Sequence, residues 1–124
     1  MKKDLSKKKE NALKAITSLK KALDRDWKND EELRDAVIQR FEFSLETFWK
    51  LQKAIFEDEG VILASPKAVF RQMLQAGLMD DKQTEFALKI VDDRNQTSHT
   101  YNKELAEDIA SRIPSYYQFL LDLL

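Results

Sequence analysis

The chain has 124 residues, with 2 Gly, 2 Pro, no Cys, one His and a formal net charge of −1. This length fits one domain, and the scarcity of turn-forming residues argues against an all-β sandwich or barrel, so the composition favours an all-α domain. The lack of Cys excludes a disulfide scaffold and a thiolate zinc site, and a single His gives little support to any other metal site, so we expect no cofactor.

The first helix is predicted over residues 5–27, where apolar side chains recur every three, four or seven positions and form one stripe. Most of its Lys residues lie off this stripe, so a solvated face is a simpler interpretation than a phosphate-binding patch. A second helix is capped by Asn29 or Asp30 and should run to about Glu59. Nearly half of its circumference is apolar, which predicts the central element of a bundle.

Phe43 lies on the opposite side of this second helix, among the smaller residues Ala36, Thr47 and Ala54. Small neighbours would let a second surface approach the aromatic ring. The pattern therefore indicates a subunit or partner contact, with an ordinary isolated surface Phe as the alternative.

A short third helix is predicted over residues 66–76. Ser65-Pro66 supplies an N-cap followed by proline at the first helical position, and Gly77 supplies a C-terminal signal. The apolar run Val61-Ile62-Leu63 before it has no second strand to pair with, so we expect a packed connection.

The fourth helix is capped by Asp80 or Asp81 and should end near Ser98. Asn102 caps the last helix, in which Pro114 should cause a bend without ending the helix. Four long helices and one short one, joined by tight connections, predict an antiparallel four-helix up-and-down bundle with one additional short helix.

Charge and targeting signals give little indication of function. The segment Met1–Lys21 carries +6 and the remaining residues carry −7, so the bulk charge does not identify a nucleic-acid binder. No apolar stretch approaches the roughly 20 residues of a membrane-spanning helix, and the sequence begins without the apolar core of a signal peptide. We expect a cytoplasmic protein that does not bind membranes.

The polar stretch 94–101, Arg-Asn-Gln-Thr-Ser-His-Thr-Tyr, interrupts the regular pattern. Arg94 lies in the middle of the apolar face of the fourth helix, where an unpaired buried charge costs several kcal/mol. A carboxylate from a neighbouring helix would satisfy this guanidinium. A bound phosphate would do so as well, because it matches the planar fork in the same bidentate way.

His99 is the only His, and its side chain can both give and take a proton near neutral pH. On an unbroken helix it would lie about 140° around from Arg94. The two residues therefore converge only if the helix ends before His99 or if they act across two subunits. Tyr101 offers a phenol that could donate a hydrogen bond, stack or be modified. The plainer alternatives are a structural His at a helix end and a half-buried Tyr.

The pattern Arg94-x4-His99-x-Tyr101, set between the last two long helices, resembles the Arg-x4-6-His motif of HEPN domains. In particular, it is similar to that of the nucleotidyltransferase substrate-binding proteins, the partners of minimal nucleotidyltransferases. The resemblance extends over the whole chain in the number and order of helices, and it implies one HEPN-like helical bundle domain over residues 1–124.

The resemblance also implies a function. It implies a homodimer in which the motifs of two subunits face one cleft, and a minimal nucleotidyltransferase encoded nearby. In toxin–antitoxin members of the type VII-like class, the HEPN protein is a metal-independent ribonuclease, and the transferase neutralises it by adding AMP to the tyrosine of the motif. Carried over by position, Arg94 and His99 would be catalytic and Tyr101 would be modified, with RNA as the substrate.

Cleavage of RNA by its own 2′-OH needs a base, an acid and a cation for the pentacoordinate phosphate. One chain supplies one His, so a two-fold dimer could supply both proton-transfer groups, with Arg94 at the phosphate and Asn95 and Ser98 as weaker candidates for substrate contacts. The alternative is a non-catalytic helical module that presents substrate or an adaptor surface to the transferase. A bundle without any site would instead pair Arg94 with an internal carboxylate and leave His99 in solvent.

Overall fold

The computed structural model describes residues 4–124, and this part of the chain is helical without strands. Its elements are α1 (Ser6–Leu23), η1 (Trp27–Asn29), α2 (Glu31–Asp58), α3 (Pro66–Gln75), α4 (Asp81–Gln96), η2 (Thr97–His99) and α5 (Lys103–Leu123), where η marks a 3-10 turn. The all-α prediction is confirmed, and the regular antiparallel four-helix up-and-down bundle stays a prediction. No helix within residues 4–124 is both long and apolar enough to cross a membrane.

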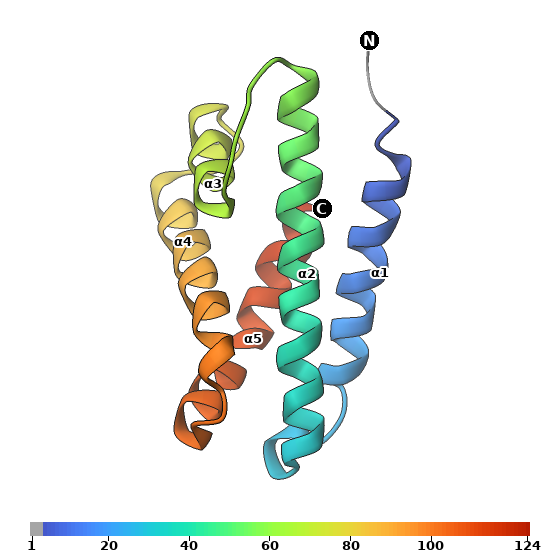
Figure 1. The fold of residues 1–124 in the computed structure, drawn as a ribbon, viewed down its shortest axis with the longest axis vertical. Helices are drawn as coiled ribbons and strands as arrows, with labels where there is room; N and C mark the ends of the chain where they lie inside the picture. Colours follow the sequence, from blue (N-terminus) through green and yellow to red (C-terminus); the bar gives the residue numbers. More distant parts are fainter. Residues whose placement is uncertain (1–3) are drawn as a thin grey trace.

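Helix α2 is the central element, as its broad apolar sector predicts. It contacts α1, α3, α4 and α5. In Figure 1, α1 and α2 run side by side in opposite directions, α3 and α4 lie on the other flank of α2, and α5 crosses behind it. The C-terminal end of α4 and the start of α5 therefore meet beside the N-terminal half of α2.

Local side-chain caps explain where four of the helices begin. The side-chain oxygens of Asp30, Ser65, Asp80 and Asn102 accept hydrogen bonds from backbone N–H groups in the first turns of α2, α3, α4 and α5. The side chain of Gln83 accepts a bond in return from the backbone N–H of Asp80 and completes a capping box. Caps of this kind stabilise a helix by about 1 kcal/mol each. All four were among the predicted caps.

Two predicted boundaries and contacts differ from the structure. The first helix ends at Leu23, and Trp27 begins the separate turn η1, because the chain bends to bring this indole into the core. In the connection after α2, Val61 and Leu63 pack against the core as expected, whereas Ile62 is 79% exposed. Helix α5, in contrast, continues through Pro114 as predicted.

One hydrophobic core joins all five helices. Phe41 of α2 lies 5.7 Å from Tyr116 of α5 between ring centroids, and Phe48 stacks on Phe70 of α3 at 5.8 Å. Phe43 lies outside this core and is 64% exposed, in agreement with its predicted position on the opposite side of the helix. The packing of Phe41 against Tyr116 fixes α5 relative to α2 beside the end of α4.

Candidate functional site

The helix that carries Arg94 ends two residues later. Helix α4 stops at Gln96, and a 3-10 turn over Thr97–His99 follows it. The hydroxyl of Thr100 donates to the carbonyl oxygen of Thr97 at 2.9 Å, which stabilises the end of this turn. The sequence left two ways for Arg94 and His99 to act together, a helix that ends before His99 or a contact across two subunits. The structure shows that the helix ends before His99, and the contact across subunits stays a prediction.

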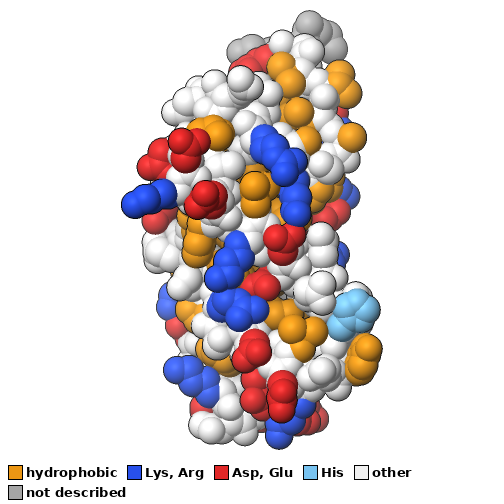
Figure 2. Space-filling view, turned by 90° about the vertical axis from the view of Figure 1, so that its left-hand side faces the viewer, with side chains coloured by type: hydrophobic (Ala, Val, Ile, Leu, Met, Phe, Trp, Pro, Cys, Tyr) orange, Lys and Arg blue, Asp and Glu red, His pale blue; other side chains and the backbone are white. Residues whose placement is uncertain are grey.

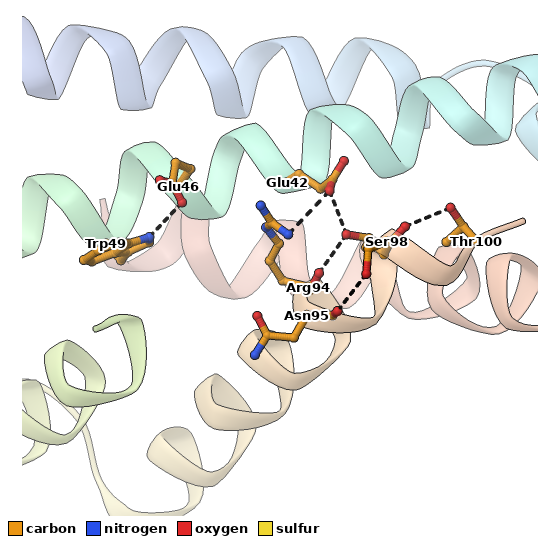
Figure 3. A network of polar contacts seen from close by, with 8 residues as sticks. Glu42, Glu46, Trp49, Arg94, Asn95, Ser98 and Thr100 are labelled. Atoms are coloured by element: carbon orange, nitrogen blue, oxygen red, sulfur yellow. Dashed lines mark hydrogen bonds and ion pairs between the residues drawn. The ribbon is translucent and has the colours of Figure 1, made fainter. Parts of the chain in front are cut away.

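Arg94 points toward α2 and lies beside Glu42 (Figure 3). Its Nη1 atom is 3.5 Å from Oε2 of Glu42, and the two side chains are 36% and 32% exposed. A carboxylate from a neighbouring helix was one of the two predicted partners for this guanidinium. Because both groups remain about one-third exposed, Arg94 is accessible from solvent as well as paired.

Thr97 ties the 3-10 turn to the same carboxylate. Its Oγ1 atom donates to Oε2 of Glu42 at 2.7 Å and also lies 2.7 Å from the carbonyl oxygen of Arg94, a second acceptor. Thr97 is buried, so its hydroxyl must have a partner. Glu42 therefore contacts both the last turn of α4 and the turn that leads to His99.

The side chains of His99, at the end of this turn, and Tyr101, two residues later, lie at the surface. Both are exposed, Tyr101 at 86%, and their rings meet edge to face with centroids 6.1 Å apart. Figure 2 shows the only His of the chain, in pale blue, at the surface, and the charges on the same face are of both signs. No hydrogen bond or ion pair joins His99 to Arg94 in residues 4–124. A paired Arg94 and a solvent-facing His99 are what a helical domain without a site would also show.

Asn95 lies in the last turn of α4, and Ser98 lies in the 3-10 turn that follows it. Both are exposed, and the Ser98 hydroxyl lies 3.5 Å from the carbonyl oxygen of Asn95, at the limit of a hydrogen bond. In Figure 3 the Asn95 side chain points away from α2. Arg94 points toward α2, so within one chain Asn95 and Arg94 do not face a common ligand position.

A second carboxylate on α2 lies one turn beyond Glu42. Oε2 of Glu46 accepts a hydrogen bond from Nε1 of Trp49 at 3.0 Å, and its Oε1 atom pairs with Nζ of Lys50 at 3.0 Å. Burial would raise the pKa of the Glu46 carboxyl, but the bonds from Trp49 and Lys50 and the charges of Lys50 and Arg94 outweigh it and hold the pKa below its usual value. The i, i+4 spacing of Glu42 and Glu46 at the edge of the apolar sector was the available sequence signal.

Asp93, which precedes Arg94, faces α5 and connects the end of α4 to that helix. It accepts a forked pair of hydrogen bonds from Arg112, at 2.7 Å from Nε and 3.1 Å from Nη2, and a 2.5 Å bond from the Tyr116 hydroxyl. Burial would raise the pKa of Asp93, but these bonds and the charge of Arg112 lower it on balance. Burial and the neighbouring carboxylate raise the pKa of the Tyr116 phenol. Sequence reasoning missed this network.

These contacts determine what the site can bind. Asp93 and Glu42 hold the end of α4 between α5 and α2, while Arg94, His99 and Tyr101 remain reachable. In residues 4–124, no group of three or more His, Asp or Glu side chains is placed to hold a metal ion. An arginine fork, an imidazole and a phenol are suited to phosphate binding and proton transfer.

Comparison with known proteins identifies the family. The model of the family described as nucleotidyltransferase substrate binding protein like matches residues 7–124. The chain belongs to this family. The HEPN-type interpretation is consistent with it. A search of the curated proteins gives no match to this family member.

A solved structure supports the fold of this member of the nucleotidyltransferase substrate binding protein-like family. The crystal structure of a protein from Thermus thermophilus superposes with a TM-score of 0.82 and is 42% identical in sequence. The match covers 90% of this chain and 94% of that one. The family description implies association with a nucleotidyltransferase.

Proposed function

We propose that this family member is the substrate-binding, HEPN-type subunit of a minimal nucleotidyltransferase system and the toxin of a toxin–antitoxin pair. Its activity is metal-independent cleavage of RNA through Arg94 and His99, in one HEPN-like helical domain that acts as a homodimer. The transferase neutralises it by adding AMP to Tyr101. Family membership and the resemblance of the Arg94–Tyr101 motif support this proposal.

The observation that carries the proposal is the outward display of His99 and Tyr101 on the turn after Arg94. An enzyme that modifies a phenol has to surround it, and Tyr101 is 86% exposed. In the modification, the Tyr101 oxygen attacks the α-phosphorus of ATP, its proton is released and pyrophosphate leaves. Tyr116, in contrast, is buried and donates its hydrogen to Asp93, so it is not a competing target.

RNA cleavage by this site requires two chains. The 2′-oxygen attacks the adjacent phosphorus, and His99 of one protomer takes the 2′-OH proton. The P–O5′ bond breaks, and a protonated His99 of the partner gives its proton to the leaving 5′-oxygen. The products end in a 2′,3′-cyclic phosphate and a 5′-OH. Arg94 contacts the phosphate oxygens, and Asn95 and Ser98 contact neighbouring parts of the RNA.

The alternative is a non-catalytic module that presents substrate or an adaptor surface to the transferase. The pairing of Arg94 with Glu42 in the single chain favours this second function, because it occupies the guanidinium with a carboxylate of the same chain. An RNA cleavage assay on the purified protein separates the two. Products with 2′,3′-cyclic phosphate ends that disappear in R94A and H99A variants support the nuclease, whereas intact RNA together with tight transferase binding supports the module.

Incubation with the neighbouring transferase and ATP tests the other half of the proposal. Mass spectrometry should find one added AMP on Tyr101 and none in a Y101F variant. Transfer to another residue, or no transfer at all, contradicts the proposed neutralisation.

A further inference from the structure

Glu42 lies beside Arg94, the residue that would bind a phosphate in the proposed function. Its Oε2 atom lies 3.5 Å from Arg94 Nη1 and accepts the Thr97 hydroxyl bond at 2.7 Å. Helix α2 thus brings a carboxylate against the guanidinium of the motif. Like a phosphodiester, a carboxylate carries one negative charge and can accept two hydrogen bonds from an arginine.

The pairing of Arg94 is looser than that of Arg112, the partner of the adjacent Asp93. Arg112 makes two hydrogen bonds to Asp93, at 2.7 Å and 3.1 Å, through the forked edge of its guanidinium. The closest approach of Arg94 to Glu42 is longer, 3.5 Å from Nη1, with about a third of each side chain exposed. Ion pairs of that geometry change an equilibrium constant by at most about fivefold. A phosphate with two oxygens on the fork can therefore compete with Glu42.

Thr97 allows this exchange without leaving a buried hydroxyl unpaired. Its Oγ1 atom already lies 2.7 Å from the carbonyl oxygen of Arg94 as well as 2.7 Å from Glu42. If Glu42 moves away, the Thr97 hydroxyl can donate its hydrogen to the Arg94 carbonyl oxygen instead. The loss of the carboxylate therefore does not leave this buried donor without an acceptor. The 3-10 turn that contains His99 thus keeps one of the two hydrogen-bond acceptors of Thr97.

We propose that Glu42 is an internal competitor for Arg94. In the free protein it neutralises the guanidinium, and a phosphate group of the RNA backbone displaces it on binding. This inference rests on the proposed function in one respect, that Arg94 is the phosphate contact. Glu42 thereby sets how tightly the site binds RNA, and removal of its charge strengthens binding.

The test compares Glu42→Gln with Glu46→Gln. Both variants remove one negative charge from the same face of α2. Glu46 makes its direct contacts with Trp49 and Lys50, and Arg94 acts on it only through its charge, whereas Glu42 is ion-paired with Arg94. The probe is a fluorescent 2′-O-methyl RNA, which lacks the nucleophile and so cannot be cleaved, with inorganic phosphate as a competitor. We expect E42Q to bind the RNA about two- to fivefold more tightly than wild type and E46Q to remain close to wild type.

A double-mutant cycle assigns the effect to Arg94. In an R94A background, E42Q should give no gain. Equal tightening by E42Q and E46Q would show a net-charge effect and overturn the inference. Unchanged or weaker binding by a folded E42Q protein would show that Glu42 only positions the turn, and it would overturn the inference as well. Absence of RNA and phosphate binding to E42Q has the same consequence.

A measurement on the wild-type protein keeps the test independent of how the variants fold. In NMR titrations with the 2′-O-methyl RNA, the Arg94 Nε–H and Thr97 amide signals should shift together as Glu42 is displaced. Binding that leaves both signals in place contradicts the displacement. RNA that binds in this way but is never cut in its unmodified form refutes the nuclease proposal and leaves the role of Glu42 intact.

Discussion

The Asp93 network makes a quantitative prediction about stability. An Asp93→Asn substitution keeps the shape of the side chain but removes the charge that accepts three hydrogen bonds, two from Arg112 and one from Tyr116. Hydrogen bonds to a charged group contribute about 1.5–3 kcal/mol each, but they are not additive, and the amide retains one acceptor. Asp93 is 13% exposed and Arg112 is 34% exposed, so the released guanidinium regains part of its hydration.

We therefore expect D93N to lower the free energy of unfolding by about 2–3 kcal/mol at pH 7. Urea denaturation followed by circular dichroism measures this difference, and Tm should fall by roughly 4 °C for each kcal/mol lost. The control is D92N, which also removes one carboxylate charge, from the preceding residue. Asp92 is 63% exposed and pairs with Lys67, so its loss should cost less than about 1 kcal/mol.

The pH dependence has a definite sign. The folded-state pKa of Asp93 lies below its usual value, so the carboxylate contributes stability above the unfolded pKa of about 3.9 and loses it as the pH falls through the folded value. The difference between wild type and D93N should thus be constant from pH 7 to about pH 5 and shrink below about pH 4. A D93N protein as stable as D92N at pH 7, or a difference that persists unchanged into acid, would refute this account of the network.

Two further predictions concern exposed aromatic side chains. A Y101F variant should accept no AMP from the transferase and ATP. The control is Y117F, which alters a half-buried Tyr of α5 and should accept AMP as wild type does. Labelling of Y101F would show that the target lies elsewhere. In the proposed homodimer, a Phe43→Glu substitution places a charge on a 64% exposed ring position and should shift the protein from dimer to monomer in light scattering, with the helical circular dichroism spectrum unchanged. A dimer that persists would exclude Phe43 from the subunit contact.

The features that sequence could predict are those determined by neighbours along the chain. The caps Asp30, Ser65, Asp80 and Asn102 each act on a backbone group two or three residues away. All four were among the predicted caps, Asp30 and Asp80 each as one of two alternatives. A helix end before His99 was one of two alternatives for the polar stretch, and α4 ends at Gln96, two residues before the predicted end near Ser98. Phe43 could also be placed outside the core, because the 3.6-residue period of α2 fixes its side.

The features that sequence missed depend on how one helix is rotated against another. A carboxylate for Arg94 was one of two alternatives, but its identity as Glu42 requires the relative positions of α2 and α4. Asp93 and Arg112 are 19 positions apart, and no pattern on either helix indicates that they meet. The end of α1 was also misplaced, because Leu23 and Trp27 keep a helical spacing while the chain between them turns.

Cleavage of a defined RNA by the purified protein in excess EDTA, compared among wild type, H99A and R94A, decides whether the Arg94–His99 motif is a nuclease site. The account predicts metal-independent cleavage to 2′,3′-cyclic phosphate ends, with a rate that falls at least about 100-fold in each variant because each removes a proton-transfer or charge-stabilising group. The Tm of both variants should stay close to that of wild type, since His99 is exposed and the Arg94 pair is about one-third exposed. Cleavage that depends on a divalent metal, or that survives H99A, would contradict the account.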